Sequence, residues 1–350
     1  MRTAIGLAMA AVVAASALYA FSARPTPPLP ETRLPVNRMN FTTIAPAGNA
    51  WVAGGELGTI VSSGDEGKSW TADKVDPVRY ALITRIVFID DKTGMAVGHE
   101  GQILRSDDGG KDWKELHFDE KNGAPLMSIA KLPSGQWLAV GAFGRALRSA
   151  DDGKTWEQIT IPGVGDKHLN YITKAADGHR WMLVGEHGLV LTSTDGGENW
   201  SVVPPFYNGS LYGIVELAGG GWLVYGMRGN AYRTDAGLRE WTKVAVPAPI
   251  SMYGSAKLAD GTLLLVGQGG MVLRSTDNGK TLTVARAGGR SAFTDIGIAP
   301  DGTWLIASEG GLLRIDPAAQ AAFAANAAPA APLTSTASAT PATQASGAQK

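Results

Sequence analysis

Residues 106–113 read SDDGGKDW and place Asp107, Asp108 and Asp112 within six positions of one another. Clustered carboxylates are the ligands that Ca²⁺ and Mg²⁺ prefer, and a pair of them supplies the chemistry of glycoside hydrolysis. The glycines between them suit a tight turn. The stretch is therefore a candidate for a metal site, for a sugar-cleaving site, or for a turn that only shapes the fold.

This stretch is one copy of a recurring pattern, Ser-x-Asp-x-Gly-x-x-Trp, which matches the Asp box of bacterial sialidase-type repeats. The aspartates and tryptophans of four complete copies and one near copy are Asp65 and Trp70, Asp108 and Trp113, Asp151 and Trp156, Asp195 and Trp200, and Asp277 with Leu282 in the tryptophan position. A catalytic site needs groups from several segments to converge, whereas these copies are spread along the chain. We therefore interpret them as structural: the carboxylate caps N–H groups of its own turn, and the tryptophan packs into the sheet.

The Asp boxes belong to a longer repeat. Its leading residues are Gly55, Gly98, Gly141, Gly185, Gly226, Gly267 and Ser308, which are 43, 43, 44, 41, 41 and 41 residues apart. A period in the low forties indicates a repeat architecture. Each unit holds four short apolar runs separated by turn residues, and the second run usually begins with tryptophan. The sequence predicts an all-β fold, a seven-bladed β-propeller of four-stranded antiparallel blades.

The seventh unit ends after its third run, at Ile315, so we expect an N-terminal strand over residues 32–36 to close the ring and cover the free edge. The predicted organisation is a signal peptide or N-terminal anchor over residues 1–23, a linker over 24–31, the propeller over 32–316, and a disordered tail over 317–350. The tail is almost entirely Ala, Pro, Ser, Thr and Gln, and a transient helix near 317–328 would have nothing obvious to bury.

The N-terminus has the features of a secretory signal. Arg2 precedes an apolar run over residues 4–21, and small residues follow. The run is also long enough for an uncleaved membrane anchor. Both alternatives predict a periplasmic or other extracytoplasmic location. The chain has no cysteine, which excludes disulfides and thiolate zinc sites, and its formal net charge of −1 argues against nucleic-acid binding. We expect no cofactor and no metal.

Two series of charged residues are candidates for partner binding. The turns after the second strands carry Glu56, Glu100, Glu186 and Glu309, which are either solvated turn residues or an acidic rim. His99 and His187 lie in different units and do not form a metal-binding cluster. The third strands carry Arg105, Arg148, Arg233, Arg274 and Arg314 at one register. These arginines either pack over tryptophan rings or form a positive ring for an acidic partner. Arg38, Arg79, Arg85 and Arg290 are expected to add to a basic surface.

In a propeller the first strands line the central channel, the turns between second and third strands lie on one face, and the Asp boxes lie on the other. Binding is expected on the first face or in the channel. An Asp-box glycoside hydrolase or a sialidase-like carbohydrate-binding protein is the alternative function. The arginine motif Phe-Arg-Ile-Pro of sialidases is absent, the nearest string being Leu313-Arg314-Ile315-Asp316, and no long insertion is available to build a sugar cleft.

The repeat Val-Gly-x-x-Gly-x-Ile-Leu-Arg-Ser-x-Asp-x-Gly-x-x-Trp, seven times after a secretion signal, resembles the photosystem II stability/assembly factor family over residues 39–316. This resemblance implies a non-enzymatic propeller that uses an arginine-rich patch to bind an integral membrane protein or membrane complex. We expect the propeller to be monomeric. The chain lacks the lipoprotein cysteine typical of cyanobacterial members. We therefore keep the assembly or scaffold role but leave the client open, with a transporter as one candidate.

Overall fold

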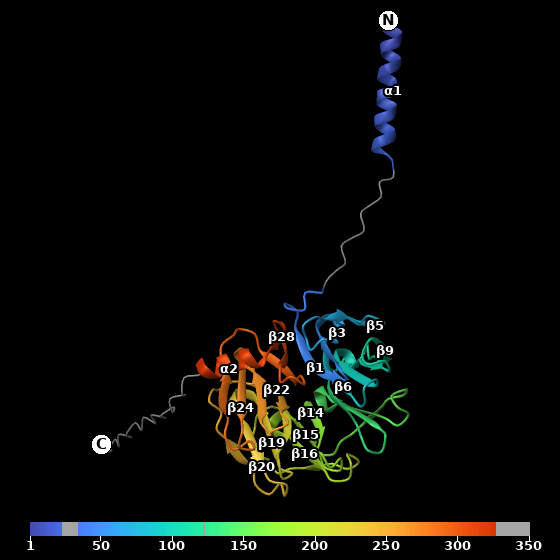
Figure 1. The fold of residues 1–350 in the computed structure, drawn as a ribbon. Helices are drawn as coiled ribbons and strands as arrows, with labels where there is room; N and C mark the ends of the chain where they lie inside the picture. Colours follow the sequence, from blue (N-terminus) through green and yellow to red (C-terminus); the bar gives the residue numbers. More distant parts are fainter. Residues whose placement is uncertain (23–33, 122, 327–350) are drawn as a thin grey trace, which may run out of the picture. The chain divides into compact units, whose positions relative to one another are not determined.

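The computed structural model describes residues 1–22, 34–121 and 123–326, and the chain divides into two units, residues 1–34 and 35–350 (Figure 1). The first unit contains helix α1, Arg2–Ala20, which has no buried residue. Its 19 residues are long and apolar enough to cross a membrane, a test that a signal sequence also passes. The helix is thus compatible with either of the expected N-terminal segments.

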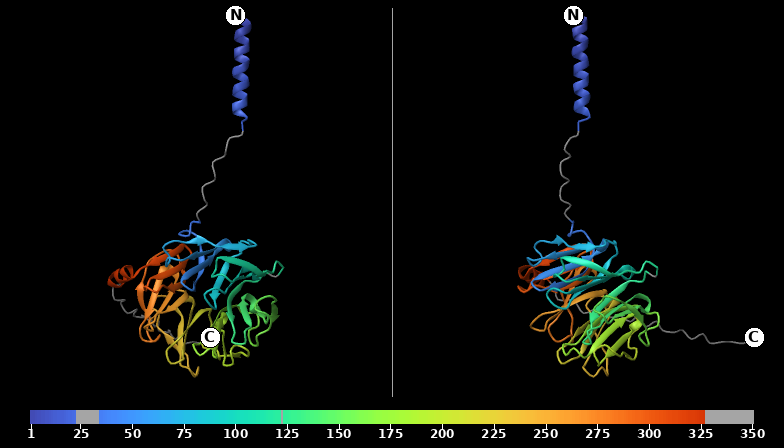
Figure 2. Two further views of the ribbon diagram at one scale, coloured as in Figure 1. Left: turned by 45° about the vertical axis from the view of Figure 1, so that its right-hand side comes forward. Right: turned by 90° about the vertical axis from the view of Figure 1, so that its right-hand side faces the viewer.

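The second unit is a seven-bladed β-propeller, which confirms the predicted fold class (Figure 2). The innermost strands are β1 Phe41–Ala47, β6 Ile83–Phe88, β10 Leu126–Lys131, β14 Leu169–Lys174, β18 Leu211–Glu216, β22 Met252–Lys257 and β26 Phe293–Ile298. The second strands are β2 Ala50–Gly55, β7 Gly94–Gly98, β11 Trp137–Gly141, β15 Trp181–Gly185, β19 Trp222–Gly226, β23 Leu263–Gly267 and β27 Trp304–Ser308.

The third strands are β3 Ile60–Ser63, β8 Ile103–Ser106, β12 Ala146–Ser149, β16 Val190–Ser193, β20 Ala231–Thr234, β24 Met271–Ser275 and β28 Gly311–Ile315. The fourth strands are β4 Thr71–Ala72, β9 Asp112–His117, β13 Glu157–Ile159, β17 Ser201–Val202, β21 Thr242–Val244 and β25 Thr283–Arg286. Six short 3-10 turns join second to third strands: η1 Glu56–Gly58, η2 His99–Gly101, η3 Ala142–Gly144, η4 Glu186–Gly188, η5 Met227–Gly229 and η6 Gln268–Gly270.

The core lies between neighbouring blades. In β7, β11 and β15 every residue is buried, because both faces of these strands are covered by the adjacent sheets. One cluster, for example, joins Leu138 of the third blade to Leu183 of the fourth. The η turns lie where the innermost strands begin, since Phe41 pairs with Gly55 just before η1. We call this end the turn face and the opposite end the Asp-box face.

The predicted closing strand is not found. Residues 34–36 form no strand, and residues 32–33 lie outside the described part of the chain. The described part of the seventh blade has three strands, and Val36 contributes one bond, from Leu312 N–H to its carbonyl at 2.8 Å. Pro35 has no N–H to donate to a sheet. Side chains of β26 join the seventh blade to the first: Thr294 Oγ1 donates to Phe41 O at 2.6 Å, as Thr84 Oγ1 donates to Leu126 O between the second and third blades.

Two further segments cover blade edges. Strand β5, Lys74–Asp76, pairs in parallel with β9 and makes the second blade five-stranded. Residues 317–326, expected to be disordered, form helix α2, Pro317–Asn326, so that expectation is wrong for these ten residues. Ala319 and Phe323 pack together against the core cluster of the sixth and seventh blades. Their i, i+4 spacing places them on one helical face. Residues 327–350 lie outside the described part of the chain.

Candidate functional site

The Asp boxes are closed hydrogen-bonded loops. In SDDGGKDW, Ser106 Oγ donates to Asp108 Oδ1 at 2.8 Å, and the same carboxylate oxygen accepts the N–H groups of Lys111 and Asp112 at 3.0 and 3.1 Å. Trp113 Nε1 donates to Gly110 O at 2.7 Å. All these bonds stay within the loop, as a structural role requires. The side chains of Asp107 and Asp112 take no part in them.

The other copies share this arrangement, and it affects their acidity. The residue four positions after each aspartate donates hydrogen bonds to its carboxylate, and these bonds lower the pKa of four of the aspartates to about 2: Asp65, Asp151, Asp195 and Asp277. A carboxyl held ionised by local N–H and hydroxyl donors is a poor general acid near neutral pH. The loops are therefore suited to cap turns and not to protonate a leaving group.

The turn glutamates fall into two classes. Glu56, Glu186 and Glu309 accept the backbone N–H of the residue that precedes an innermost strand, at 3.0, 3.0 and 3.1 Å. These bonds hold the residue before each innermost strand against the turn of the same blade. Glu100 occupies the second turn position instead, with φ 57°, and is exposed. The four do not form one rim, and partner binding by them stays a prediction.

The arginine series connects blades. Arg105 Nη1 donates to Asp152 Oδ2 at 2.8 Å, in the Asp box of the next blade. Arg148 reaches Glu198 at 3.8 Å, and Arg314 donates to Glu66 O at 3.2 Å, again across a blade boundary. Arg233 is partly buried and Arg274 is exposed. These arginines are thus distributed around the ring and do not converge, and their role in partner binding stays a prediction.

The first blade lacks this arginine and has a partly buried acid in its place. Ser62 occupies the arginine register and donates to Asp73 Oδ1 at 2.7 Å, while Asp73 Oδ2 is buried with no hydrogen-bond partner among the described residues. Burial raises the pKa of Asp73 to about 7, opposed by the Ser62 hydroxyl and supported by the charges of Asp108 and Asp112. Asp73 is therefore protonated in the folded chain at mildly acidic pH.

This acid predicts a pH dependence of stability. Because the folded pKa of Asp73 is raised above that of an unfolded carboxyl, about 3.9, its contribution to the free energy of unfolding is complete below about pH 4 and is lost as pH rises through about 7. Asp73→Asn should remain neutral throughout. In urea denaturation between pH 4.5 and 7.5, the native chain should lose stability relative to this variant. A constant difference between the two would contradict the prediction.

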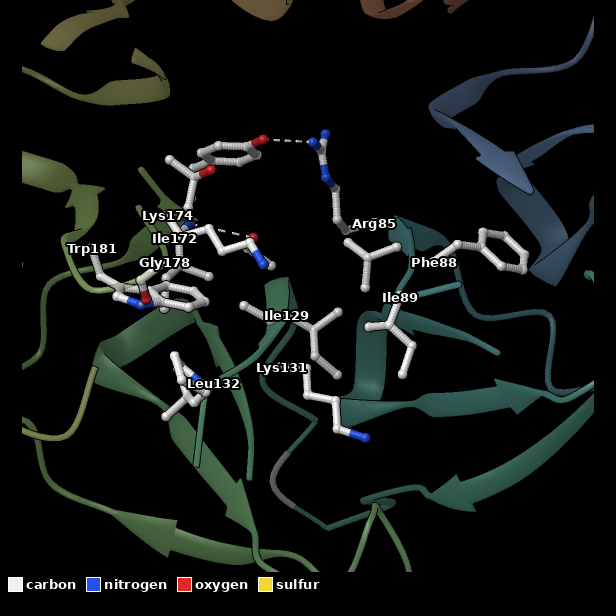
Figure 3. Close-up of a pocket in the computed structure, with 16 residues that line it drawn as sticks. Arg85, Phe88, Ile89, Ile129, Lys131, Leu132, Ile172, Lys174, Gly178 and Trp181 are labelled. Carbon is white, nitrogen blue, oxygen red and sulfur yellow. Dashed lines mark hydrogen bonds between the residues drawn. The ribbon is translucent and has the colours of Figure 1, made fainter. Parts of the chain in front are cut away.

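A pocket of about 600 Å³ that could hold a partner lies at the Asp-box end of the channel. It lies between β6, β10 and β14, and Figure 3 shows Arg85, Ile129 and Trp181 around it. Its walls include Val87, Leu132 and other apolar side chains, whereas the charged residues that line it are all cationic: Arg85, Lys131 and Lys174. Lys131 is paired with Asp152 at 2.9 Å, and Lys174 is exposed.

Arg85 holds the inner wall of the pocket. Its Nη2 donates to Tyr171 Oη at 2.8 Å, and its Nη1 lies 3.2 Å from Asp295 Oδ2. Asp295 also accepts the N–H groups of Ile44 and Ile296 at 3.1 and 3.0 Å. Burial raises the pKa of the Asp295 carboxyl, and Arg85 and these N–H donors oppose the rise. The network links the second, fourth, seventh and first blades around the channel.

The sequence analysis missed most of this site. It grouped Arg85 with other arginines of a basic surface, but the guanidinium is bound to Asp295 and Tyr171 in the channel, and neither of these two residues was singled out. The register of the innermost strands could have identified these residues. The third position of such a strand is occupied by Thr43, Arg85, Ser128, Tyr171 and Asp295. Among the described residues, no group of three or more His, Cys, Asp or Glu side chains is placed to hold a metal ion. A cationic rim with apolar walls can bind a polypeptide segment that carries a carboxylate.

Known proteins with this architecture differ in function. A structure of YCF48 bound to a D1 peptide has a TM-score of 0.65 and 20% identity, and the match covers 83% of this chain and 98% of that one. YCF48 from Cyanidioschyzon merolae has a TM-score of 0.63 and 18% identity, covering 82% and 98%. A virginiamycin B lyase from Staphylococcus aureus, with quinupristin, has a TM-score of 0.67 and 15% identity, covering 81% and 96%. At these identities the matches show the fold alone.

The family is shown by sequence. No curated protein matches the chain. The family described as photosynthesis system II assembly factor YCF48 matches residues 29–107 and 113–329, which is most of the chain and all seven blades. The solved YCF48 structures share this propeller over nearly their whole length. The chain therefore belongs to the YCF48 family of photosynthesis system II assembly factors.

Proposed function

We propose that this protein is a non-enzymatic, extracytoplasmic assembly factor that binds an extended segment of an integral membrane protein in the pocket at the channel mouth. The observation that carries the proposal is the pocket itself, where Arg85, Lys131 and Lys174 surround apolar walls. Such a surface matches a peptide that has both apolar side chains and a carboxylate. Membership of an assembly-factor family and a relative bound to a D1 peptide support the same kind of partner.

The placement outside the cytoplasm rests on α1, whose apolar length suits a signal or an anchor. A monomeric propeller is sufficient for this role, since the pocket is formed within one chain. The client is a subunit of a membrane complex, and a transporter subunit is as compatible with the chemistry of the pocket as a photosystem subunit. The absence of catalysis is part of the proposal, consistent with Asp-box carboxyls whose pKa is too low for acid catalysis.

The test is a charge reversal at the pocket with a matched control. Lys174→Glu changes an exposed lysine whose side chain makes no hydrogen bond or ion pair with the described residues, whereas Lys257→Glu changes the exposed lysine at the same register of the sixth blade, outside the pocket. The full chain, immobilised in detergent, should recover a membrane protein from solubilised membranes. Lys174→Glu should lower the apparent affinity about tenfold, which corresponds to about 1.4 kcal/mol, and Lys257→Glu should not. Equal recovery by all three chains would refute this site.

A further inference from the structure

Three large apolar side chains are exposed together on the turn face. Leu57, Val78 and Tyr80 are 59%, 56% and 70% exposed. Leu57 lies in η1, and the other two lie in the link between β5 and β6. The two segments touch, because a Cβ on Gly58 would lie 3.4 Å from Tyr80 N. We call these three residues the turn-face patch.

The fold places a left-handed residue at the second position of each of the six η turns, but it does not require a large apolar side chain there. Leu57 and Tyr80 have φ of 56° and 58°, a left-handed conformation that bulky side chains resist. The corresponding tip of η6 is Gly269, which adopts φ 67° without strain. A large apolar side chain that is both strained and exposed adds little to folding, so it indicates contact with something outside the propeller.

The path of the N-terminal segment indicates what the patch contacts outside the propeller. Asn40, just before β1, exchanges hydrogen bonds with Glu56, the neighbour of Leu57: its N–H donates to Glu56 Oε1 at 3.0 Å, and its carbonyl accepts Glu56 N–H at 2.9 Å. The N-terminal segment therefore joins the propeller beside the patch. Residues 21–34 number 14, which is a reach of at most about 50 Å from the end of α1. A bilayer that holds α1 is thus within reach of the patch.

The chemistry of the patch also fits a lipid surface. Tyrosine is favoured at the boundary between lipid and water, where its ring and its hydroxyl are both accommodated. Arg38, two residues before Asn40, is exposed and has no ion-pair partner among the described residues. A cation in the segment that leads into the propeller suits anionic headgroups. The pocket opens at the opposite end of the channel, so contact at the patch would leave it accessible.

We propose that α1 is retained as an anchor and that Leu57, Val78 and Tyr80 rest on the surface of the same bilayer. The inference rests on the extracytoplasmic placement in the proposed function. It gives the propeller a fixed orientation, with its turn face toward the lipid and its peptide pocket toward soluble segments of the client.

The absence of cysteine from the chain makes a direct test possible. Leu57→Cys and Tyr80→Cys, each labelled with an environment-sensitive fluorophore, are compared with Val202→Cys and Leu313→Cys, which are 45% and 38% exposed on outer strands. The full chain is placed in vesicles of phosphatidylcholine and phosphatidylglycerol that contain a nitroxide-labelled lipid. Quenching at positions 57 and 80 should exceed quenching at 202 and 313 severalfold. Equal quenching at all four positions would overturn the proposal.

A second comparison separates this inference from the function of the pocket. The double variant Leu57→Ser, Tyr80→Ser should lose quenching of a label at Val78→Cys but should recover the client normally from detergent extracts. Lys174→Glu should keep the quenching of this label but should recover less of the client. If the double variant instead lost the client in detergent and kept its lipid quenching, the patch would be a protein-docking surface and the lipid assignment would be wrong.

Discussion

Asp295→Ala should lower the free energy of unfolding by about 3–5 kcal/mol, the usual cost of removing one member of a buried ion pair. Asp295 is 4% exposed and lies 3.2 Å from Arg85. Its loss would leave the Arg85 cation in the channel without its counter-charge and would deprive Ile44 N–H of its acceptor. Because Asp295 joins the seventh blade to the first and the second, ring closure itself should weaken.

Urea denaturation of the full chain measures this effect, and two variants serve as controls. Asp107→Ala removes the exposed partner of Arg105, at 2.8 Å, and should cost only about 0–1 kcal/mol because that pair is solvated. Arg85→Met combined with Asp295→Ala should recover much of the loss, since no unpaired charge remains. If Asp295→Ala were as mild as Asp107→Ala, the side-chain account of ring closure would be wrong.

Trp113→Ala should cost about 3–5 kcal/mol, as expected for a large ring removed from a packed core. Trp113 is 1% exposed and packs edge-on against Phe88, with ring centroids 6.0 Å apart. Trp113 is also the β9 residue that pairs with Val75 of β5. The loss is a large share of the stability of an ordinary domain, about 5–15 kcal/mol, so thermal unfolding should shift visibly.

The matched control is the same substitution in the first Asp box. Trp70 is only partly buried, so Trp70→Ala should cost about 1–2 kcal/mol. Trp113→Phe should retain most of the packing and lose mainly the Nε1 bond to Gly110 O. Equal losses in Trp113→Ala and Trp70→Ala would show that burial of the ring does not determine the strength of an Asp box.

The seven-bladed architecture and the role of SDDGGKDW both follow from the amino-acid sequence. A repeat of 41 to 44 residues fixes the blade count, because each unit must bury its faces against the next one. The Asp-box bonds are local: Ser106 Oγ and Asp108 Oδ1 accept the N–H groups of Gly110 and Asp112, each four residues further along the chain. Local hydrogen bonding follows from residue type and spacing alone, so comparison of the copies was enough to interpret the motif as a turn.

Only the tertiary structure decided which charged residues share an environment. Arg85 and Asp295 are 210 positions apart and meet because the ring brings their strands to one channel. In the sequence the arginines and the turn glutamates are both series of charged residues that recur from blade to blade. In the structure Arg105 binds the next blade, whereas Glu56 binds the backbone of its own blade. Ring closure likewise uses contacts between distant residues, since Thr294 and Asp295 join the last blade to the first. Long-range contacts of this kind depend on closure of the whole ring, which no single repeat encodes.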